Sequence, residues 1–296
     1  MTASYNAGRG NCHSDAETGI MSAALAHKVI ATLKIRLLIF LGCLGSLATV
    51  RACPVQAQGG PPFLTNDPGT PGNGNWEINI ASAQSVVRGQ ADYQSPQLDI
   101  NLGIGNRIQL TYQGAYVLQT RPGQPTQTGW TNALPGVKWR FFDQGPGGWQ
   151  ISIFPQIQTG ASLAARLSGI AGDGPRFYLP LEIARQVGPL DLNFEIGYFF
   201  PWSGPEERTI GFVAGHSFTK RLELDGEVYN DWAMHALPHS TTWDFGGRYK
   251  LHDGFVLLFM AGRSFSGNAS GQPEYLGYFG IQVLLSKFGR TLTHDE

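Results

Sequence analysis

The feature of this sequence that most constrains its fold is a series of short alternating segments after residue 75, joined by connections that are alternately long and short. We predict about 12 strands, in which connections such as 88–94 and 161–175 are long and connections such as Gly188-Pro189 and Lys220-Arg221 are tight. Transmembrane β-barrels combine tight turns at the periplasmic rim with longer loops at the outer rim. The pattern therefore predicts an all-β fold, a transmembrane antiparallel up-and-down β-barrel over residues 76–288, with both chain ends on the periplasmic side.

Within each predicted strand, apolar and polar side chains alternate, so the two faces of the strand differ in character. Leu190, Leu192 and Phe194 share one face of a strand, whereas Asp191 and Asn193 share the other. Charged residues make up 15% of the chain, whereas a soluble domain carries about 25%. A soluble barrel of this many strands would enclose a space too wide for side chains to fill. We therefore expect the apolar faces to meet lipid and the polar faces to line a lumen.

Two segments depart from this regular pattern. Residues 58–75 contain four prolines and five glycines, which exclude a regular strand. They form either a flexible periplasmic tail or an ordered plug, in which Phe63 and Leu64 would need apolar cover. The strand predicted at 255–261 is apolar on both faces, which indicates either a contact inside the lumen or a different register.

Residues 1–57 have the pattern of a secretory signal peptide. Basic residues precede an apolar run at 37–50, and the small residues of 55–57 then provide a cleavage site. The run of about 14 residues is shorter than the roughly 20 that a spanning helix needs, although an uncleaved anchor is the alternative. Met21 is a second candidate start, and Cys53 offers a weaker lipoprotein motif.

The predicted barrel ends at Phe288 and is followed by a tail at 289–296. Outer-membrane barrels commonly end in an aromatic residue that the insertion machinery reads, and here Phe288 is the candidate for that role. The predicted partners are outer-membrane lipid, a small-molecule solute and the barrel insertion machinery. No nucleic acid is predicted as a partner, because the chain has a net charge of -1 and no basic cluster.

Charged residues on the lumen-facing side of the predicted strands are the candidates for a solute-binding site. They are Lys138, Arg140, Glu182, Glu195, Glu223, Asp225, Glu227, Asp244, Arg248 and Lys250. The acidic column at 223–227 lies on one strand, and Arg248 and Lys250 on the next strand are placed to pair with it. The charges form either a structural salt-bridge network or a charged constriction that sets selectivity.

The sequence offers no arrangement that predicts an enzyme or a cofactor. His216 and Ser217 are adjacent, so they point to opposite faces of a strand and cannot form a nucleophile and base pair. The histidines lack metal-ligand spacing, and all three cysteines, at 12, 43 and 53, lie in the leader. We therefore expect no catalytic residues, no metal and no cofactor.

The segment at 62–71, PFLTNDPGTP, followed by Trp76-Glu77-Ile78-Asn79, resembles the opening of a family of bacterial outer-membrane proteins. The family is named for the meta-pathway of phenol degradation. Shorter similar segments at 98–103, 136–141 and 246–250 extend the resemblance over most of residues 60–285. Asn66 and Asn75 depart from the family's pattern. The resemblance implies a barrel in the outer membrane of a Gram-negative bacterium and a role in the uptake of aromatic compounds.

Taken together, these observations favour an outer-membrane channel or transporter for the uptake of small, aromatic or hydrophobic solutes. The first alternative is a structural or adhesive barrel with a filled lumen. The second alternative is an outer-membrane enzyme, which would depend on His216 or His239.

Overall fold

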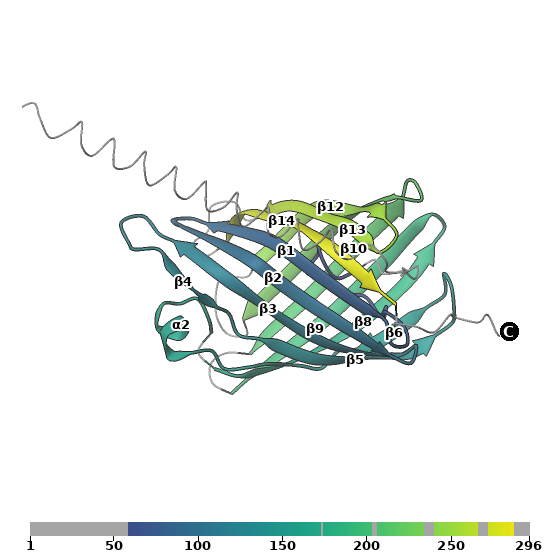
Figure 1. The fold of residues 1–296 in the computed structure, drawn as a ribbon, viewed down its shortest axis with the longest axis horizontal. Coiled ribbons are helices and arrows are strands. Elements are labelled where there is room, and N and C mark those ends of the chain that lie inside the picture. Colours follow the sequence, from purple (N-terminus) through teal and green to yellow (C-terminus); the bar gives the residue numbers. More distant parts are fainter. Residues whose placement is uncertain (1–58, 173, 203–205, 234–239, 266–271, 287–296) are drawn as a thin grey trace, which may run out of the picture. The chain divides into compact units, whose positions relative to one another are not determined.

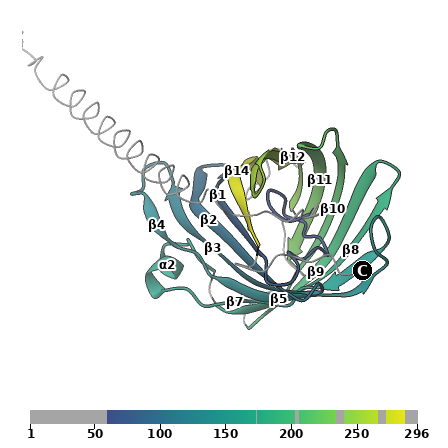
Figure 2. The same ribbon diagram turned by 45° about the vertical axis from the view of Figure 1, so that its right-hand side comes forward.

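The computed structural model describes residues 59–172, 174–202, 206–233, 240–265 and 272–286, which form an antiparallel β-barrel (Figures 1 and 2). A short helix, α2 (Leu163–Leu167), lies in the connection before β8. The strands are β1 (Trp76–Val87), β2 (Gln90–Ile104), β3 (Ile108–Thr120), β4 (Gln127–Trp130), β5 (Leu134–Asp143), β6 (Gln150–Ile153), β7 (Gln156–Gln158), β8 (Arg176–Val187), β9 (Leu190–Pro201), β10 (Glu207–Ser217), β11 (Leu222–Ala233), β12 (Ser240–His252), β13 (Phe255–Ser264) and β14 (Pro273–Leu285).

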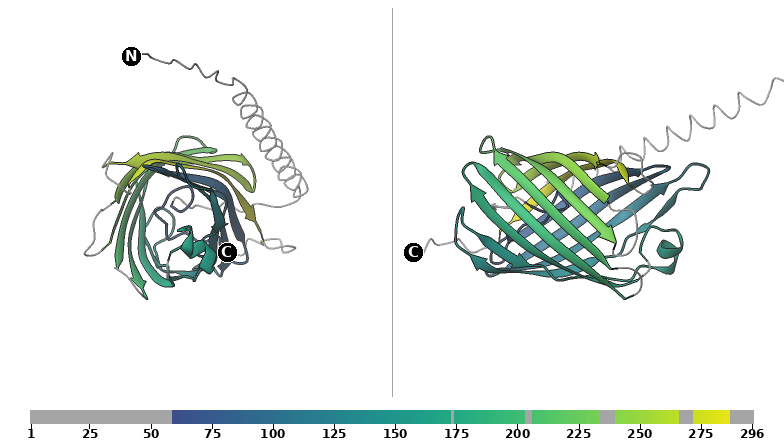
Figure 3. Two further views of the ribbon diagram at one scale, coloured as in Figure 1. Left: turned by 90° about the vertical axis from the view of Figure 1, so that its left-hand side faces the viewer. Right: turned by 180° about the vertical axis from the view of Figure 1, so that it is seen from behind.

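The barrel is closed, because β14 pairs with β1 from Trp76↔Leu285 onward (Figure 3). β4 and β5 both pair with β3, so together they form one interrupted strand of the barrel. β6 and β7 both pair with β8 and form a second interrupted strand. Counted in this way, the described residues form a barrel of twelve strands, all antiparallel to their neighbours. The predicted antiparallel barrel of about 12 strands is therefore confirmed.

The interruption between β6 and β7 falls at Phe154-Pro155. Pro155 has no N–H to donate to a ladder, and its carbonyl accepts from the N–H of Val137 at 3.0 Å. Phe154 is 1% exposed, and Gly136 on β5 leaves room for its ring, because a Cβ at Gly136 would lie 3.0 Å from it. An apolar side chain therefore enters the lumen at this point.

The first connection is shorter than the sequence predicted. Residues 88–94 were expected to form a long loop, but β1 and β2 continue to pair as far as Val87↔Gln90. The turn is Arg88-Gly89, in which Gly89 has a φ of 79°, a conformation that glycine adopts without steric cost. Residues 90–94 resemble a loop in sequence because they carry little apolar surface, yet the ladder needs only their main chain.

The outer surface of the barrel is apolar. Side chains at the middle of the strands, such as Ile196, Phe212 and Val228, are 44%, 43% and 44% exposed. An exposed apolar band of this kind is the lipid-facing surface of a transmembrane barrel. No helix among the described residues is long and apolar enough to cross a membrane.

The inner surface carries the polar residues. Glu182, Glu195, Asp225, Glu227 and Asp244 are all between 0% and 2% exposed. The alternation of the strands therefore places the two kinds of side chain on the faces that the sequence predicted. The interior is filled in part by residues 59–75, hereafter the N-terminal segment.

Candidate functional site

The N-terminal segment lies inside the barrel (Figure 2). Its prolines exclude a ladder with the neighbouring strands, and Gly60, Gly72 and Gly74, with φ values of 70°, 82° and 73°, turn the chain where other residues would be strained. At the end of the barrel where β1 begins, the segment joins the wall through two main-chain hydrogen bonds with Gly103. From there it runs into the lumen, where Thr65 is 0% exposed.

Two glutamates of the wall accept hydrogen bonds from consecutive main-chain N–H groups of the segment. Glu227 accepts from Leu64 at 3.1 Å and from Thr65 at 2.6 Å. Glu195 accepts from the main-chain N–H of Asn66 at 3.0 Å and from its side-chain amide at 2.8 Å. These charge-assisted bonds supply the partners that buried carboxylates require.

Two cations of the wall donate to main-chain carbonyl groups of the same segment. Arg248 Nη2 donates to the carbonyl oxygens of residues 59–61 at 2.8, 3.3 and 3.1 Å. Lys138 Nζ donates to the carbonyl oxygen of Asp67. The wall therefore binds the segment mainly through its main chain.

Both cations also pair with carboxylates of the wall. Lys138 lies 3.3 Å from Glu182, and Arg248 lies 3.0 Å from Glu223 and 3.6 Å from Asp225. The pairing of Arg248 with the acidic column of β11 agrees with the placement that the sequence indicated. Each cation thus joins the wall to the segment.

The structure does not bring all the predicted site residues together. Arg140 lies near the C-terminal end of β5, where its Nε is 3.2 Å from Asp143. Lys250 lies near the turn after β12 and pairs with Asp253 at 2.7 Å, where the two side chains are 46% and 71% exposed. This hydrogen bond lowers the pKa of the Asp253 carboxyl. Lys250 is too close to the rim of the barrel to reach the acidic column at 223–227.

Gly211 on β10 is the point of closest approach between the wall and the segment. A Cβ at this position would collide with the side chain of Thr65. In the register of the sheet, Gly211 pairs with Glu195 on β9 and Tyr229 on β11. The missing side chain therefore creates the hollow that Thr65 fills.

An apolar cluster holds the tip of the segment. Phe63 is 5% exposed and packs with Leu258 and Met260 of β13, together with Tyr278 and Val213. This contact explains why β13 is apolar on both faces, since one face meets lipid and the other meets the segment.

A cavity of about 530 Å³ lies above the segment, on the side of the connection 159–175. Residues 61–64 and Asn66 of the segment line it from below. Its wall combines aromatic and apolar side chains with amides and with two charged side chains, Asp99 and Arg176. The aromatic, apolar and amide side chains include Leu98, Leu134, Tyr178, Phe199, Tyr229, Met260, Gln97, Gln113, Gln156 and Gln158. The rings of Tyr178 and Phe199 are stacked, with their centroids 4.0 Å apart.

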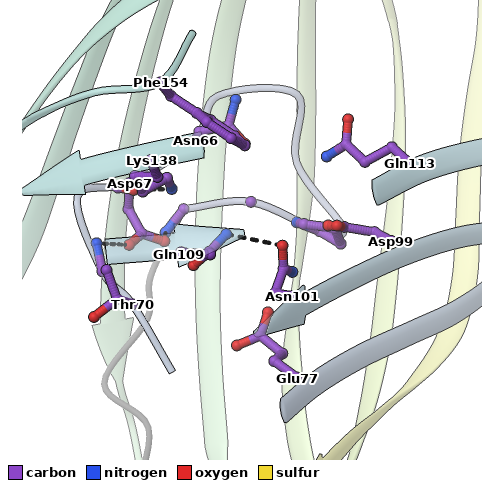
Figure 4. A pocket seen from close by; sticks show the side chains of 14 residues that line it. Asn66, Asp67, Thr70, Glu77, Asp99, Asn101, Gln109, Gln113, Lys138 and Phe154 are labelled. Carbon is purple, nitrogen blue, oxygen red and sulfur yellow. Dashed lines mark hydrogen bonds between the residues drawn. The ribbon is translucent and has the colours of Figure 1, made fainter. Parts of the chain in front are cut away.

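A second, much smaller cavity of about 30 Å³ lies between the segment and strands β1 to β3 (Figure 4). Asp67 and Lys138 lie on one side of it, and Glu77, Asp99 and Asn101 lie on the other. The space has room for only a few water molecules. The segment therefore fits this part of the wall closely.

Sequence reasoning missed the main partner of the lumen charges. It paired charged side chains with one another, whereas Glu195 and Glu227 bind main-chain N–H groups. Main-chain N–H and C=O groups are the same in every residue except proline, so a sequence does not indicate which of them will bind a side chain. The signals that were present are the glycine at position 211 and the doubly apolar β13.

Among the described residues, no group of three or more His, Cys, Asp or Glu side chains is placed to hold a metal ion. His216 contacts the carbonyl oxygen of Pro189 at 2.8 Å through Nδ1, and His239 lies outside the described residues. In the part of the chain that the structure describes, the groups gathered in the lumen include carboxylates, the cations Lys138, Arg176 and Arg248, amides and aromatic rings.

The sequence matches no known protein family model, and no curated protein matches it in sequence. Its fold is similar to that of an outer-membrane channel from Pseudomonas putida F1, with 9% identity, a TM-score of 0.59, and coverage of 77% of this chain and 100% of that chain. The KdgM porin is 12% identical, with a TM-score of 0.49 over 69% of this chain and 98% of that chain. The NanC porin is 8% identical, with a TM-score of 0.48 over 71% of this chain and 100% of that chain. The likeness to the Pseudomonas channel shows that this chain has the fold of an outer-membrane β-barrel.

Proposed function

We propose that the protein is an outer-membrane channel for the uptake of small solutes, and that the N-terminal segment is its gate. The observation that carries this proposal is the cavity of about 530 Å³ inside the barrel, which the segment closes from below. A lumen lined by amides and charges provides an aqueous route, and its narrowest part sets selectivity. The structural similarity to a protein described as an outer-membrane channel supports the same function.

The solutes that we propose are small molecules with an apolar or aromatic part. The aromatic pair Tyr178 and Phe199 and the apolar side chains of Leu98 and Met260 line the cavity beside glutamine amides. The resemblance to the family named for phenol degradation agrees with such solutes. Weak, mixed contacts of this kind allow a solute to enter and also to leave.

Passage requires the segment to leave its place, because it lies across the lumen beneath the cavity. The segment is held by main-chain hydrogen bonds to wall side chains and by the burial of one aromatic ring, Phe63. Displacing this ring is therefore the most direct way to open the channel.

Single-channel recording in a planar bilayer tests the proposal with the full mature chain. We expect small and rare openings for the wild type. The Phe63→Asp variant should give larger and longer openings, because a carboxylate cannot remain in the apolar cluster. Leu64→Asp is the matched control: Leu64 is 47% exposed, so the same charge should leave the segment in place.

A structural or adhesive barrel is the second candidate, and a specific observation favours it. The segment fills the lumen beneath the cavity and satisfies several buried charges there. If the Phe63→Asp protein shows the heat-dependent gel mobility of a folded barrel and yet no conductance, the lumen is filled permanently and the channel function is wrong.

We also propose that residues 1–57 are a cleaved secretory signal, and that the barrel insertion machinery and outer-membrane lipid are partners of the barrel. Residues 1–58 and 287–296 lie outside the described residues. Mass spectrometry of the mature protein from the outer membrane of a Gram-negative host tests the first point, with cleavage expected after Ala57.

A further inference from the structure

Three carboxylates in the lumen lack a cationic partner. Among the described residues, Glu195, Glu227 and Asp244 take part in no ion pair. The two buried cations are engaged elsewhere, since Lys138 pairs with Glu182 and Arg248 pairs with the acidic residues at 223 and 225. The centre of the lumen therefore has an excess of negative charge.

Asp244 has fewer partners than the other two carboxylates. It is 2% exposed, and neither of its carboxylate oxygens has a hydrogen-bond partner. In the register of β11 and β12 it lies directly opposite Glu227, so two like charges are cross-strand neighbours, which is unfavourable. A positively charged N–H donor placed between them would give Asp244 a hydrogen-bond partner and would offset the repulsion between the two carboxylates.

Glu195 and Glu227 border a ready-made hollow at Gly211 on β10. Gly211 pairs with Glu195 on β9 and, on its other side, with Tyr229 on β11, two residues along the strand from Glu227, and it has no side chain to fill the space between these strands. The hydroxyl of Tyr178 donates to Glu195 at 2.6 Å and fixes the orientation of this carboxylate. In the structure, Thr65 occupies the hollow.

The N-terminal segment, which now occupies the hollow, indicates which chemical groups can bind there. The segment offers the two glutamates three successive main-chain N–H groups, at residues 64, 65 and 66. Once the segment leaves, these buried carboxylates need other N–H donors, and an unpaired buried carboxylate is unfavourable. Ammonium, amidinium and guanidinium groups offer several N–H donors together with a positive charge.

The aromatic rings at the base of the cavity favour the same class of ligand. Tyr178 and Tyr229 line the cavity beside Asn66, at the level of Glu195. Aromatic faces attract cations. The cavity of about 530 Å³ would become continuous with the three carboxylates when the residues that separate them move.

We propose that Glu195, Glu227 and Asp244 form a binding site for organic cations that carry N–H donors, a site that the N-terminal segment occupies in the closed protein. The site makes the opened lumen selective for cations. This inference rests on the proposed channel function for its selectivity, whereas binding itself can be measured without conduction.

The test uses three probes of the same shape and different charge, namely benzamidinium, benzamide and benzoate. Isothermal titration calorimetry measures their binding to the full mature chain carrying Phe63→Asp. We expect benzamidinium to bind at least about tenfold more tightly than benzamide, and benzoate to show no binding. In the wild type the segment competes, so benzamidinium should bind more weakly and should expose the segment to added protease.

Neutralising the site should remove this preference. The triple variant Glu195→Gln, Glu227→Gln, Asp244→Asn is compared with the triple variant Glu206→Gln, Asp253→Asn, Glu274→Gln, whose three side chains are on exposed residues. We expect the first to lose at least about tenfold in benzamidinium affinity and to lose cation preference in the reversal potential of a salt gradient. The second should change neither.

The outcomes separate the two proposals. Equal binding of the three probes, or benzamidinium binding that survives the first triple variant, overturns the cation site. A conducting lumen without cation preference overturns its role in selectivity and leaves the channel function standing. Benzamidinium binding in a folded protein that never conducts overturns the channel function and leaves the binding site standing.

Discussion

At the scale of single residues, Arg248 joins more parts of the molecule than any other lumen residue described above. It donates to three carbonyl groups of the N-terminal segment and pairs with two carboxylates of β11. We expect Arg248→Met to lower the free energy of unfolding by about 3–5 kcal/mol, because Asp225 would be left buried and unpaired. Urea titration in detergent measures this loss.

Lys250 provides the control on the same strand. Its ion pair with Asp253 is at the surface, with side chains 46% and 71% exposed. Surface pairs contribute at most about 1 kcal/mol, so Lys250→Met should change stability little. Equal losses in the two variants would show that Arg248 is not a bridge between wall and segment.

Gly211 is the second residue that decides the state of the lumen. A leucine here would occupy the place of the Thr65 side chain, so Gly211→Leu should displace the segment and raise its rate of cleavage by protease. Gly226→Leu is the control, since a Cβ there meets nothing nearer than the carbonyl oxygen of Asp244 at 3.9 Å. Unchanged cleavage in a folded Gly211→Leu protein would contradict the close contact.

At the scale of elements, each strand presents one face to lipid, and the cost of a charge on that face depends on depth. Phe212 lies at the middle of β10 and is 43% exposed, whereas Phe218 follows the strand at the rim and is 60% exposed. Phe212→Arg should lower stability in bilayers by about 2–4 kcal/mol, and Phe218→Arg by at most about 1 kcal/mol. Equal effects would mean that β10 does not cross the hydrocarbon core at this level.

Strand alternation was enough to predict the barrel and to assign the lumen face, because the period of two is a local property of the chain. The same rule placed Arg248 on the strand next to the acidic column, and the register sets it opposite Glu223. It could not predict the height of Lys250 within the barrel, since height depends on where the ladder begins relative to the membrane. It also missed the tight turn at Arg88-Gly89, because strand residues beyond the lipid band need no apolar face.

The site was harder to predict than the fold for a physical reason. Residues 58–75 were expected to be either a tail or a plug, and composition does not distinguish the two. What distinguishes them is a set of contacts with β9 to β13, more than a hundred residues away. Main-chain groups make most of these contacts, and every residue except proline has the same ones.

At the scale of the whole molecule, the proposed change from a closed to an open channel requires the N-terminal segment to move as a unit. A disulfide bond can prevent that movement. In the double variant Thr65→Cys, Gly211→Cys, the two Cβ positions would lie about 2.9 Å apart, which is shorter than the separation of about 3.5–4.5 Å found in disulfides, so the segment must shift slightly away from β10 as the bond forms. Because all three native cysteines lie before residue 58, no other thiol competes in a protein that begins at residue 58.

We expect the oxidised double variant to show no openings in a planar bilayer and to regain wild-type openings when a reductant is added. Each single cysteine variant is a control and should not respond to the reductant. Openings of full size in the oxidised protein would show that solutes pass without movement of the segment.

The position of the segment has a consequence for how the protein is made. The segment precedes every strand in the chain, yet Asn66 binds a residue 129 positions later and Gly59 binds a residue 189 positions later. The contact with Arg248 can form only after β12, near the other end of the chain, has been synthesised. The first part of the barrel domain to be synthesised therefore cannot reach its final place until most of the barrel strands exist.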